Sequence, residues 1–294
     1  MQLDSGWLTH FLQQERLPES YGALIRTVHA PLAAQVAARA QVRPLIVGLC
    51  GAQGSGKSTL AAVLAALLRH QGLPTAVLSI DDLYLTHEQR QQLGKTVHPL
   101  LRTRGVPGTH DVDLGLTTLT ALQHAGPVAL PAFDKGVDDR KPPGLWPVFN
   151  APAAVVILEG WCVGARPQQS AALALPINAL ERDEDASGIW RHYVNTALTR
   201  AYSQLFDKLD LQVMLQAPSF DVVYAWRLEQ EQKLRLRLQQ TGGDQSRVMD
   251  DAAVARFIAH YERITRHLLD EMPARADILL QLDAARQVQH TRGL

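Results

Sequence analysis

Residues 51–58 read G-A-Q-G-S-G-K-S, which matches the phosphate-binding pattern G-x-x-x-x-G-K-[ST]. The motif follows a short apolar run, LIVGLC at 45–50, which is typical of a buried parallel strand. It precedes a segment rich in alanine and leucine that ends at Gly72 and predicts a helix. A buried strand, a glycine-rich loop and a helix in this order restrict the chain to an α/β fold with a phosphate site at a helix N-terminus.

The residue types of this loop suit a bound nucleotide. Glycines let the backbone curl so that its N–H groups point inward, and the helix dipole adds positive potential. We expect Lys57 to reach the β- and γ-phosphates and the Ser58 hydroxyl to join a Mg²⁺ shell. The residues predicted to contact ATP are Gly51, Ala52, Gln53, Gly54, Ser55, Gly56, Lys57, Ser58 and Thr59. A glycine-rich turn with a chance Lys-Ser pair is the alternative interpretation.

The rest of the chain alternates apolar runs with helical patterns. Strands are expected at 75–80, 127–134, 153–161, 211–217 and 276–282, and long helices at 219–240 and 250–270. Asp113 is expected to cap a helix that starts at 114. The pattern predicts a P-loop NTPase fold in residues 44–294, with a mainly parallel sheet of about five strands flanked by helices. Residues 1–43 are expected to form a helical extension, interrupted or restarted at Pro31.

Charge and composition exclude several classes of protein. Lys plus Arg and Asp plus Glu both number 29, so no global field favours nucleic acid or an anionic membrane. No basic stripe interleaved with aromatics is present, which disfavours a nucleic-acid translocase. The longest apolar stretch, 60–68, is half the length of a membrane span. Only Cys50 and Cys162 are present, and with no signal-peptide pattern at the start we expect reduced thiols and a cytoplasmic protein.

Carboxylates follow two of the predicted strands. Asp81 and Asp82 end the run at 75–80, and Glu159 ends the run at 153–161. Ligands of open α/β sheets bind at such strand ends, so Asp81 is a candidate acceptor for the proton of a substrate hydroxyl. Glu159 is a candidate to organise Mg²⁺ with Ser58, and Asp82 either holds Mg²⁺ through water or caps the next turn. The alternatives are a capping or loop role for Asp81 and a solvent-exposed Glu159.

An ordered series of motifs from about Leu45 to Ile264 resembles a known family. The series is G-A-Q-G-S-G-K-S, S-I-D-D-L-Y, R-G-V-P-G-T-H-D, P-A-F-D-K-G, V-V-I-L-E-G-W and W-R-L-E-Q-E. It resembles the plant and fungal type of D-glycerate 3-kinases, which belong with uridine kinase, phosphoribulokinase and bacterial pantothenate kinase. The resemblance implies ATP- and Mg²⁺-dependent phosphorylation of a small molecule, D-glycerate, to 3-phosphoglycerate.

The resemblance also implies roles for individual residues. Asp81 matches the first aspartate of the family's D-x-F-Y motif, the presumed base. The residues predicted to bind substrate are Asp81, Tyr84, Arg104, His110, Asp111, Lys135 and Arg140. Arg104 or Arg140 can supply a fork for a carboxylate, and Lys135 can neutralise transferred phosphate. Surface positions for the two arginines and the lysine, and a structural role for His110, are the alternatives.

The helix with W-R-L-E-Q-E resembles a kinase lid at about 227–251. Arg235 and Arg237 are predicted to reach the phosphates when the lid closes and excludes water. Pairs at i,i+4, Glu229 with Lys233 and Glu231 with Arg235, give a purely structural alternative.

Two other functions fit the same motifs. The first keeps the chemistry and takes a nucleoside or a pantothenate-like acid as the acceptor. The second is an ATP-binding switch protein that hydrolyses ATP slowly and has no small-molecule acceptor.

Overall fold

The computed structural model describes residues 5–41, 43–241 and 249–294. A six-stranded sheet forms its centre, in the order β10-β9-β8-β1-β7-β2. The five predicted parallel strands are β1 (Leu45–Gly51), β2 (Thr75–Ser79), β7 (Val155–Gly160), β8 (Leu211–Gln216) and β9 (Ile278–Leu282). The mainly parallel sheet expected from the sequence is thereby confirmed.

Strand β10 (Val288–Arg292) extends the sheet and was not expected. It runs antiparallel to β9 at the sheet edge and reads VQHTR, with side chains that are exposed or half-buried. An edge strand needs no apolar run, because one side of it faces solvent. The apolar pattern that revealed the five parallel strands is therefore missing here.

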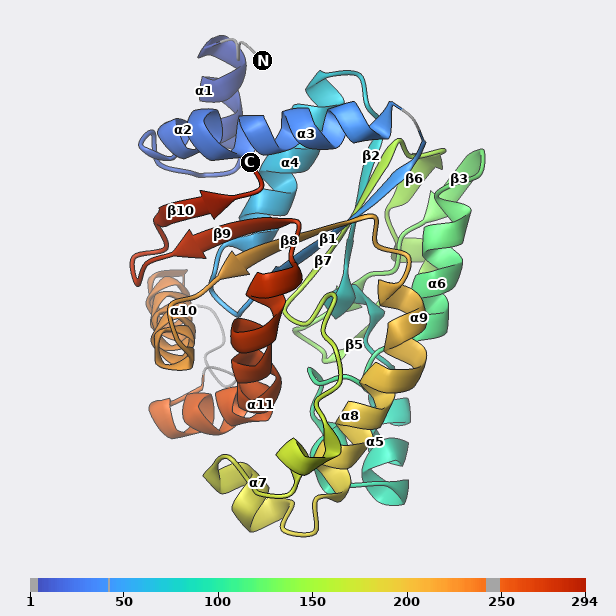
Figure 1. Cartoon of the computed structure of the whole chain (residues 1–294), viewed down its shortest axis with the longest axis vertical. Coiled ribbons are helices and arrows are strands. Elements are labelled where there is room, and N and C mark those ends of the chain that lie inside the picture. Colours follow the sequence, from blue (N-terminus) through green and yellow to red (C-terminus); the bar gives the residue numbers. More distant parts are fainter. Residues whose placement is uncertain (1–4, 42, 242–248) are drawn as a thin grey trace.

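Helices cover both faces of the sheet (Figure 1). Helix α4 (Lys57–His70) follows the P-loop and packs with α3 (Ala30–Ala40) over β1. Its apolar side is fully buried and includes Leu60, Val63, Leu64, Leu67 and Leu68. The other elements around the sheet are α6 (Val112–Ala121), α8 (Ile189–Ala197), the π-helical η6 (Leu198–Tyr202), α9 (Ser203–Phe206) and α11 (Asp251–Arg275).

The N-terminal helices share the core of the sheet. They are α1 (Ser5–Gln14), α2 (Tyr21–Leu24) and η1 (Ile25–His29), followed by α3. Pro31 lies in the first turn of α3, where its missing N–H is tolerated, and the π-helical η1 joins the two helices without a break. Leu8, Ile25 and Leu32 are buried in the same hydrophobic cluster as the strands.

Residues 127–134 do not join the central sheet, contrary to expectation. β3 (Gly126–Ala129) pairs with β6 (Val148–Ala151), and β4 (Phe133–Asp134) pairs with β5 (Asp139–Arg140) in a short hairpin. Pro127 and Pro131 lack the N–H donors that a central strand requires. The short helix η4 (Pro143–Leu145) lies between β5 and β6 in the chain.

A helix cap also differs from the prediction. Asp111, and not Asp113, caps α6: its Oδ1 accepts a hydrogen bond from the backbone N–H of Leu114 at 3.0 Å. Asp113 lies in the first turn of the helix, where its charge favours the dipole.

The remaining helices lie beyond the carboxyl ends of the strands or beside them. They are η2 (Ile80–Leu83), α5 (His87–Thr96), η3 (Pro99–Arg102), η5 (Ser170–Leu173), α7 (Ala179–Glu184) and α10 (Phe220–Thr241). Within the described ranges, none of the helices combines the length and the apolar character that a bilayer crossing requires.

Candidate functional site

The P-loop curls between β1 and α4 with two glycines in the left-handed region, Gly54 at φ +79° and Gly56 at φ +89°. A Cβ on Gly54 would lie 2.7 Å from the Cβ of Trp226 on α10. The loop therefore needs glycine at 54 both for its backbone and for the close approach of α10. Lys57 and Ser58 are the first two residues of α4, so they stand where the helix dipole is positive.

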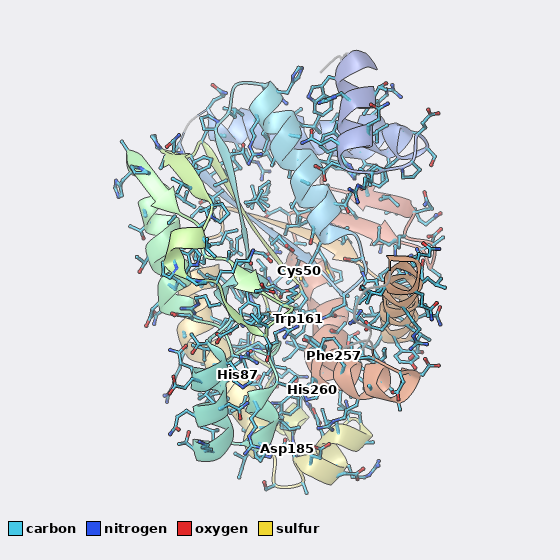
Figure 2. The ribbon with its side chains drawn as sticks, turned by 180° about the vertical axis from the view of Figure 1, so that it is seen from behind. Cys50, His87, Trp161, Asp185, Phe257 and His260 are labelled. Atoms are coloured by element: carbon cyan, nitrogen blue, oxygen red, sulfur yellow. The ribbon has the colours of Figure 1, made fainter. Side chains whose placement is uncertain are left out.

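A cavity of about 380 Å³ opens at the carboxyl ends of β1, β2 and β7. The predicted residues that line it are Gln53, Gly54, Lys57, Ser58, Asp81, Tyr84, Arg104, Lys135 and Glu159, and the others are Ser79, Trp161, Arg227, Gln230, Phe257 and Tyr261. In Figure 2, Trp161 and Phe257 lie below Cys50, which marks the end of β1. The cavity joins the P-loop to residues from six other segments of the chain.

Other P-loop residues lie outside this cavity. Ala52 is buried, and Ser55, Gly56 and Thr59 line a second cavity of about 190 Å³, which is also lined by residues of the N-terminal helices and of strands β8 to β10. The Ser55 side chain points inward, since a Cβ on Gly51 would lie 2.6 Å from its Oγ.

Ser58 and Glu159 meet at the floor of the cavity. The parallel register places Glu159 of β7 beside Leu49 of β1 and Ser79 of β2, and its side chain is only 6% exposed. The Ser58 hydroxyl donates to Glu159 Oε1 at 3.2 Å, and Oε2 is buried without a hydrogen-bond partner. Magnesium prefers a carboxylate and a hydroxyl of this kind, completed by phosphate oxygens, so the two side chains suit a Mg²⁺ ion carried by a nucleotide.

Asp81 stands directly after β2, in the short helix η2, and both of its oxygens are engaged. Oδ1 accepts from the Tyr84 hydroxyl at 2.9 Å, and Oδ2 pairs with Lys135 Nζ at 2.7 Å. Burial pushes the pKa of Asp81 upward, but the positive charges of Lys135 and Lys57 outweigh it and lower that pKa to about 2. The Asp81 carboxylate is therefore charged throughout the neutral range.

Arg104 enters the cavity from the loop before α6. Its guanidinium lies over the ring of Phe133, 5.6 Å from the centroid, and its Nη1 forms an ion pair with Asp138. Lys135 and Asp138 both belong to the chain between β4 and β5, so this hairpin brings a positive and a negative charge to the site. Arg104 and Lys135 thus line the same cavity as Asp81.

Three predicted substrate residues do not reach the cavity. His110 is buried; its ring stacks on Tyr84 with centroids 4.5 Å apart, and its Nδ1 lies 2.5 Å from the Tyr202 hydroxyl. Burial lowers the pKa of His110 to about 4, so the imidazole is neutral. Arg140 donates to the backbone oxygen of Tyr84 and to Asp111 Oδ2, at 2.9 and 3.1 Å. These side chains support the residues that do line the cavity.

Asp82 also lies outside the cavity. Its Oδ1 accepts from the backbone N–H of Phe133 at 2.9 Å, which holds the β4–β5 hairpin against η2. Burial raises the pKa of Asp82, although the Phe133 N–H acts in the opposite direction. The Asp82 carboxylate, a candidate Mg²⁺ contact in the sequence, thus accepts a backbone hydrogen bond that holds the hairpin in place.

The predicted lid arginines are placed as follows. Arg235 Nη2 donates to the backbone oxygen of Met249 at 2.9 Å, so it ties α10 to the chain before α11. The side chain of Arg237 and residues 242–248 of the predicted lid lie outside the described part of the chain. Arg227 lines the cavity, where it pairs with Glu231 at 2.6 Å and lies over the ring of Phe257.

Aromatic residues of α11 were missed by the sequence analysis. Tyr261 donates to the backbone oxygen of Arg104 at 3.3 Å, and its ring meets Trp161 edge-on with centroids 4.9 Å apart. Trp161 in turn donates its indole N–H to the Gly105 oxygen at 3.0 Å. Phe257 and Tyr261 are four residues apart on one helix face, a pattern that a core helix shows equally often.

Comparisons with known proteins agree on the type of protein. Residues 46–165 match the phosphoribulokinase/uridine kinase family. The chain is 36% identical over 229 residues to an uncharacterized kinase, mug58, of Schizosaccharomyces pombe, covering 74% of this chain and 79% of that protein. It is 32% identical over 247 residues to the chloroplastic D-glycerate 3-kinase of Arabidopsis thaliana, covering 80% of this chain and 51% of the plant protein. The solved structure of a D-glycerate 3-kinase from Cryptococcus neoformans aligns with a TM-score of 0.70 and 26% identity, over 92% of this chain and 99% of that one.

Proposed function

Because the chain belongs to the phosphoribulokinase/uridine kinase family of P-loop kinases, we propose that it transfers the γ-phosphate of ATP to a hydroxyl of D-glycerate, forming 3-phosphoglycerate. The observation that carries this proposal is the cavity that Arg104, Lys135, Asp81 and Lys57 line together, with Lys135 paired to Asp81. A small acid with a hydroxyl group needs a cation for its carboxylate and an acceptor for its proton, and the cavity offers both. The relatives named as D-glycerate 3-kinases support the same acceptor.

On the phosphate side, the loop amides and the Lys57 ammonium stabilise the charge of the transferred group. Ser58 and Glu159 would hold Mg²⁺, which supplies further neutralisation of the phosphates when bound. The buried, unpartnered Oε2 of Glu159 is the feature that favours this assignment. These groups are fixed by β1, β7 and α4, so little reorganisation accompanies the reaction.

On the acceptor side, Asp81 orients the attacking hydroxyl and receives its proton. Its low pKa is compatible with this role, because phosphoryl transfer passes through a loose transition state in which the nucleophile loses its proton late. Lys135 lies 2.7 Å from the same carboxylate, so it can exchange this partner for the transferred phosphoryl group. Arg104 is assigned to the substrate carboxylate, since its planar fork matches that group.

The test is an acceptor panel. Purified protein is incubated with Mg-ATP and D-glycerate, L-glycerate, uridine, pantothenate or no acceptor, while ADP release is measured and the phosphorylated product is identified. We expect ADP release that depends on D-glycerate, with 3-phosphoglycerate as the product. Equal turnover with and without every acceptor would overturn the assignment and favour an ATP-driven switch. Turnover with uridine or pantothenate alone would move the protein to another acceptor.

A further inference from the structure

A buried arginine lies beside the proposed acceptor site. Arg90 of α5 is 0% exposed and is among the largest fully buried side chains. Its guanidinium donates to the backbone oxygens of Leu85, Arg102 and Asp138 at 3.2, 3.0 and 2.6 Å. Its Nη2 also lies 3.0 Å from Asp138 Oδ2. A buried cation is costly unless its donors are satisfied, and these four contacts meet that requirement.

Each partner of Arg90 belongs to a segment that carries a residue of the cavity. Leu85 directly follows Tyr84, Arg102 comes two residues before Arg104, and Asp138 is in the same hairpin as Lys135. One side chain therefore fixes three segments that are distant in sequence but contribute to a single wall of the site.

Asp138 connects Arg90 to the cavity itself. One carboxylate oxygen pairs with Arg104 Nη1, and the other with Arg90 and, at 3.4 Å, with His87 Nδ1. The residue takes a left-handed backbone conformation, at φ +59°, which few side chains other than Asn and Asp adopt readily. Both arginines also lie over the ring of Phe133, at 5.6 and 5.8 Å.

The charges of this cluster leave a net attraction for an anion. Arg90 and Arg104 contribute two positive charges and Asp138 one negative charge, so the cluster has an excess of one positive charge. Arginine has five N–H donors, and the contact with Asp138 engages Nη1 of Arg104, which leaves donors for a second carboxylate. A guanidinium held at one end also loses less conformational entropy when it binds.

We propose that Asp138, anchored by Arg90, is a positioning residue that fixes the Arg104 guanidinium for the acceptor's carboxylate and so determines selectivity for a hydroxy acid. This inference rests on the proposed function, because it requires an acidic acceptor. It predicts that Asp138 acts on acceptor binding through Arg104 and has no separate effect on the nucleotide.

A double-mutant cycle tests this dependence. Arg104→Ala, Asp138→Ala and the double variant are compared for kcat, for the KM of D-glycerate and for the KM of ATP. We expect each single variant to raise the KM of D-glycerate about 10- to 100-fold, with kcat and the KM of ATP changed less than about threefold. The double variant should match Arg104→Ala, because Asp138 has no effect once its partner is removed.

Two further variants separate positioning from folding, since Arg90 itself is too deeply buried to replace safely. Asp139→Asn removes the same charge from the same hairpin, but Asp139 accepts from the backbone N–H groups of His87 and Arg140, so the KM should stay within about twofold. Asp138→Asn keeps an oxygen that can accept from Arg104 and should raise the KM less than Asp138→Ala.

The outcomes separate the proposed function from the role of Asp138. A wild-type protein that phosphorylates no acidic acceptor would overturn both the proposed function and the role of Asp138. A wild-type protein that phosphorylates D-glycerate, combined with additive effects in the cycle or an equal rise in the Asp139→Asn control, would overturn the role of Asp138 alone.

Discussion

The Ser58 hydroxyl donates to Glu159 Oε1 at 3.2 Å and thereby joins the first turn of α4 to the carboxyl end of β7. The two residues are 101 positions apart, and the parallel pairing of β1 with β7 brings them together. The second carboxylate oxygen of Glu159 is buried and unpartnered. A buried anion with a free oxygen is costly without a counter-charge, so this pair is the part of the site most in need of a cation.

We expect Glu159→Gln to raise the Mg²⁺ concentration required for half-maximal turnover and to lower kcat about 10²- to 10³-fold at saturating Mg²⁺. The amide keeps the size of the side chain and removes its charge, so the loss of turnover measures the contribution of that charge to Mg²⁺ binding. A Mg²⁺ titration of ADP release measures both effects. Glu184→Gln, which changes an exposed carboxylate paired with Arg256, is the control and should leave the titration unchanged. An unaltered Mg²⁺ requirement in Glu159→Gln would contradict the assignment.

Asp81→Asn should lower kcat about 10²- to 10⁴-fold, because an amide cannot receive the proton of the acceptor hydroxyl. ATP affinity should remain within a few-fold, since Asp81 is assigned to the acceptor hydroxyl and lies outside the P-loop. Turnover assays combined with a nucleotide-binding measurement separate the two effects. Asp134→Asn serves as the control, because Asp134 accepts from the N–H of Gly136 in the nearby hairpin and does not line the cavity. Retained turnover in Asp81→Asn would assign proton acceptance elsewhere.

Lys135→Met should shift the acid limb of the pH–rate profile to higher pH. Burial raises the pKa of Asp81, and Lys135 is the strongest of the charges that lower it, to about 2. Without Lys135 the carboxyl protonates at a higher pH, so activity is lost earlier as the pH falls. Profiles of kcat from pH 5 to 8 are compared by shape, because the variant is also slower. Lys141→Met removes a charge outside the cavity and should keep the wild-type profile, and an identical profile for Lys135→Met would refute the coupling.

Much of the fold follows from local sequence signals. The five parallel strands are apolar runs long enough to recognise, and the glycine pattern between β1 and α4 identifies the phosphate loop. Asp81 and Glu159 were predictable as neighbours, because parallel strands place their carboxyl ends at one edge of a sheet. The polar edge strand β10 lacks such a signal, and the apolar run at 127–134 does not reveal that its residues pair outside the central sheet.

The residues assigned to the acceptor are positioned by contacts that no local pattern reveals. Arg90 lies in the polar segment HEQRQQ and looks like a surface cation, yet it is buried and donates to the backbone oxygens of Leu85, Arg102 and Asp138, which are 5, 12 and 48 residues away. Asp111 shows the opposite case: a conspicuous carboxylate next to His110 caps α6 and pairs with Arg140, and it does not line the cavity. Tyr261 reaches the site only through the docking of α11, 157 residues beyond Arg104.

Acid should destabilise the protein in part through His29. Burial lowers the pKa of His29 from its usual 6.5 to about 4, so the folded protein keeps this ring neutral where the unfolded chain protonates it. The free energy of unfolding therefore falls as the pH drops from about 6.5 to about 4, by up to about 1.4 kcal/mol per pH unit for one group. Chemical denaturation at pH 7 and pH 5 should show a smaller difference for His29→Gln than for the wild type. Exposed His124→Gln should keep the wild-type difference, and an equal difference in all three proteins would disprove the role of His29.

Alanine variants of three glycines with positive φ separate the cost of backbone strain from the effect of the contact between the phosphate loop and α10. Gly54, Gly56 and Gly72 have φ of +79°, +89° and +77°, but only at Gly54 would a Cβ collide, 2.7 Å from the Cβ of Trp226. Alanine at Gly72, beyond the end of α4, should cost about 1–2 kcal/mol of stability and leave the Kd of ATP unchanged.

Gly54→Ala should weaken ATP binding about tenfold or more, because relief of the collision moves α10 away from the loop. That movement also strains the hydrogen bond from Arg286 Nε to the Gly54 oxygen, 2.7 Å long. Gly56→Ala meets open space and should show the backbone cost without displacing α10. Isothermal titration with ATP and thermal unfolding of the three variants check this order. Equal ATP affinities for Gly54→Ala and Gly72→Ala would show that contact with α10 does not determine the shape of the phosphate loop.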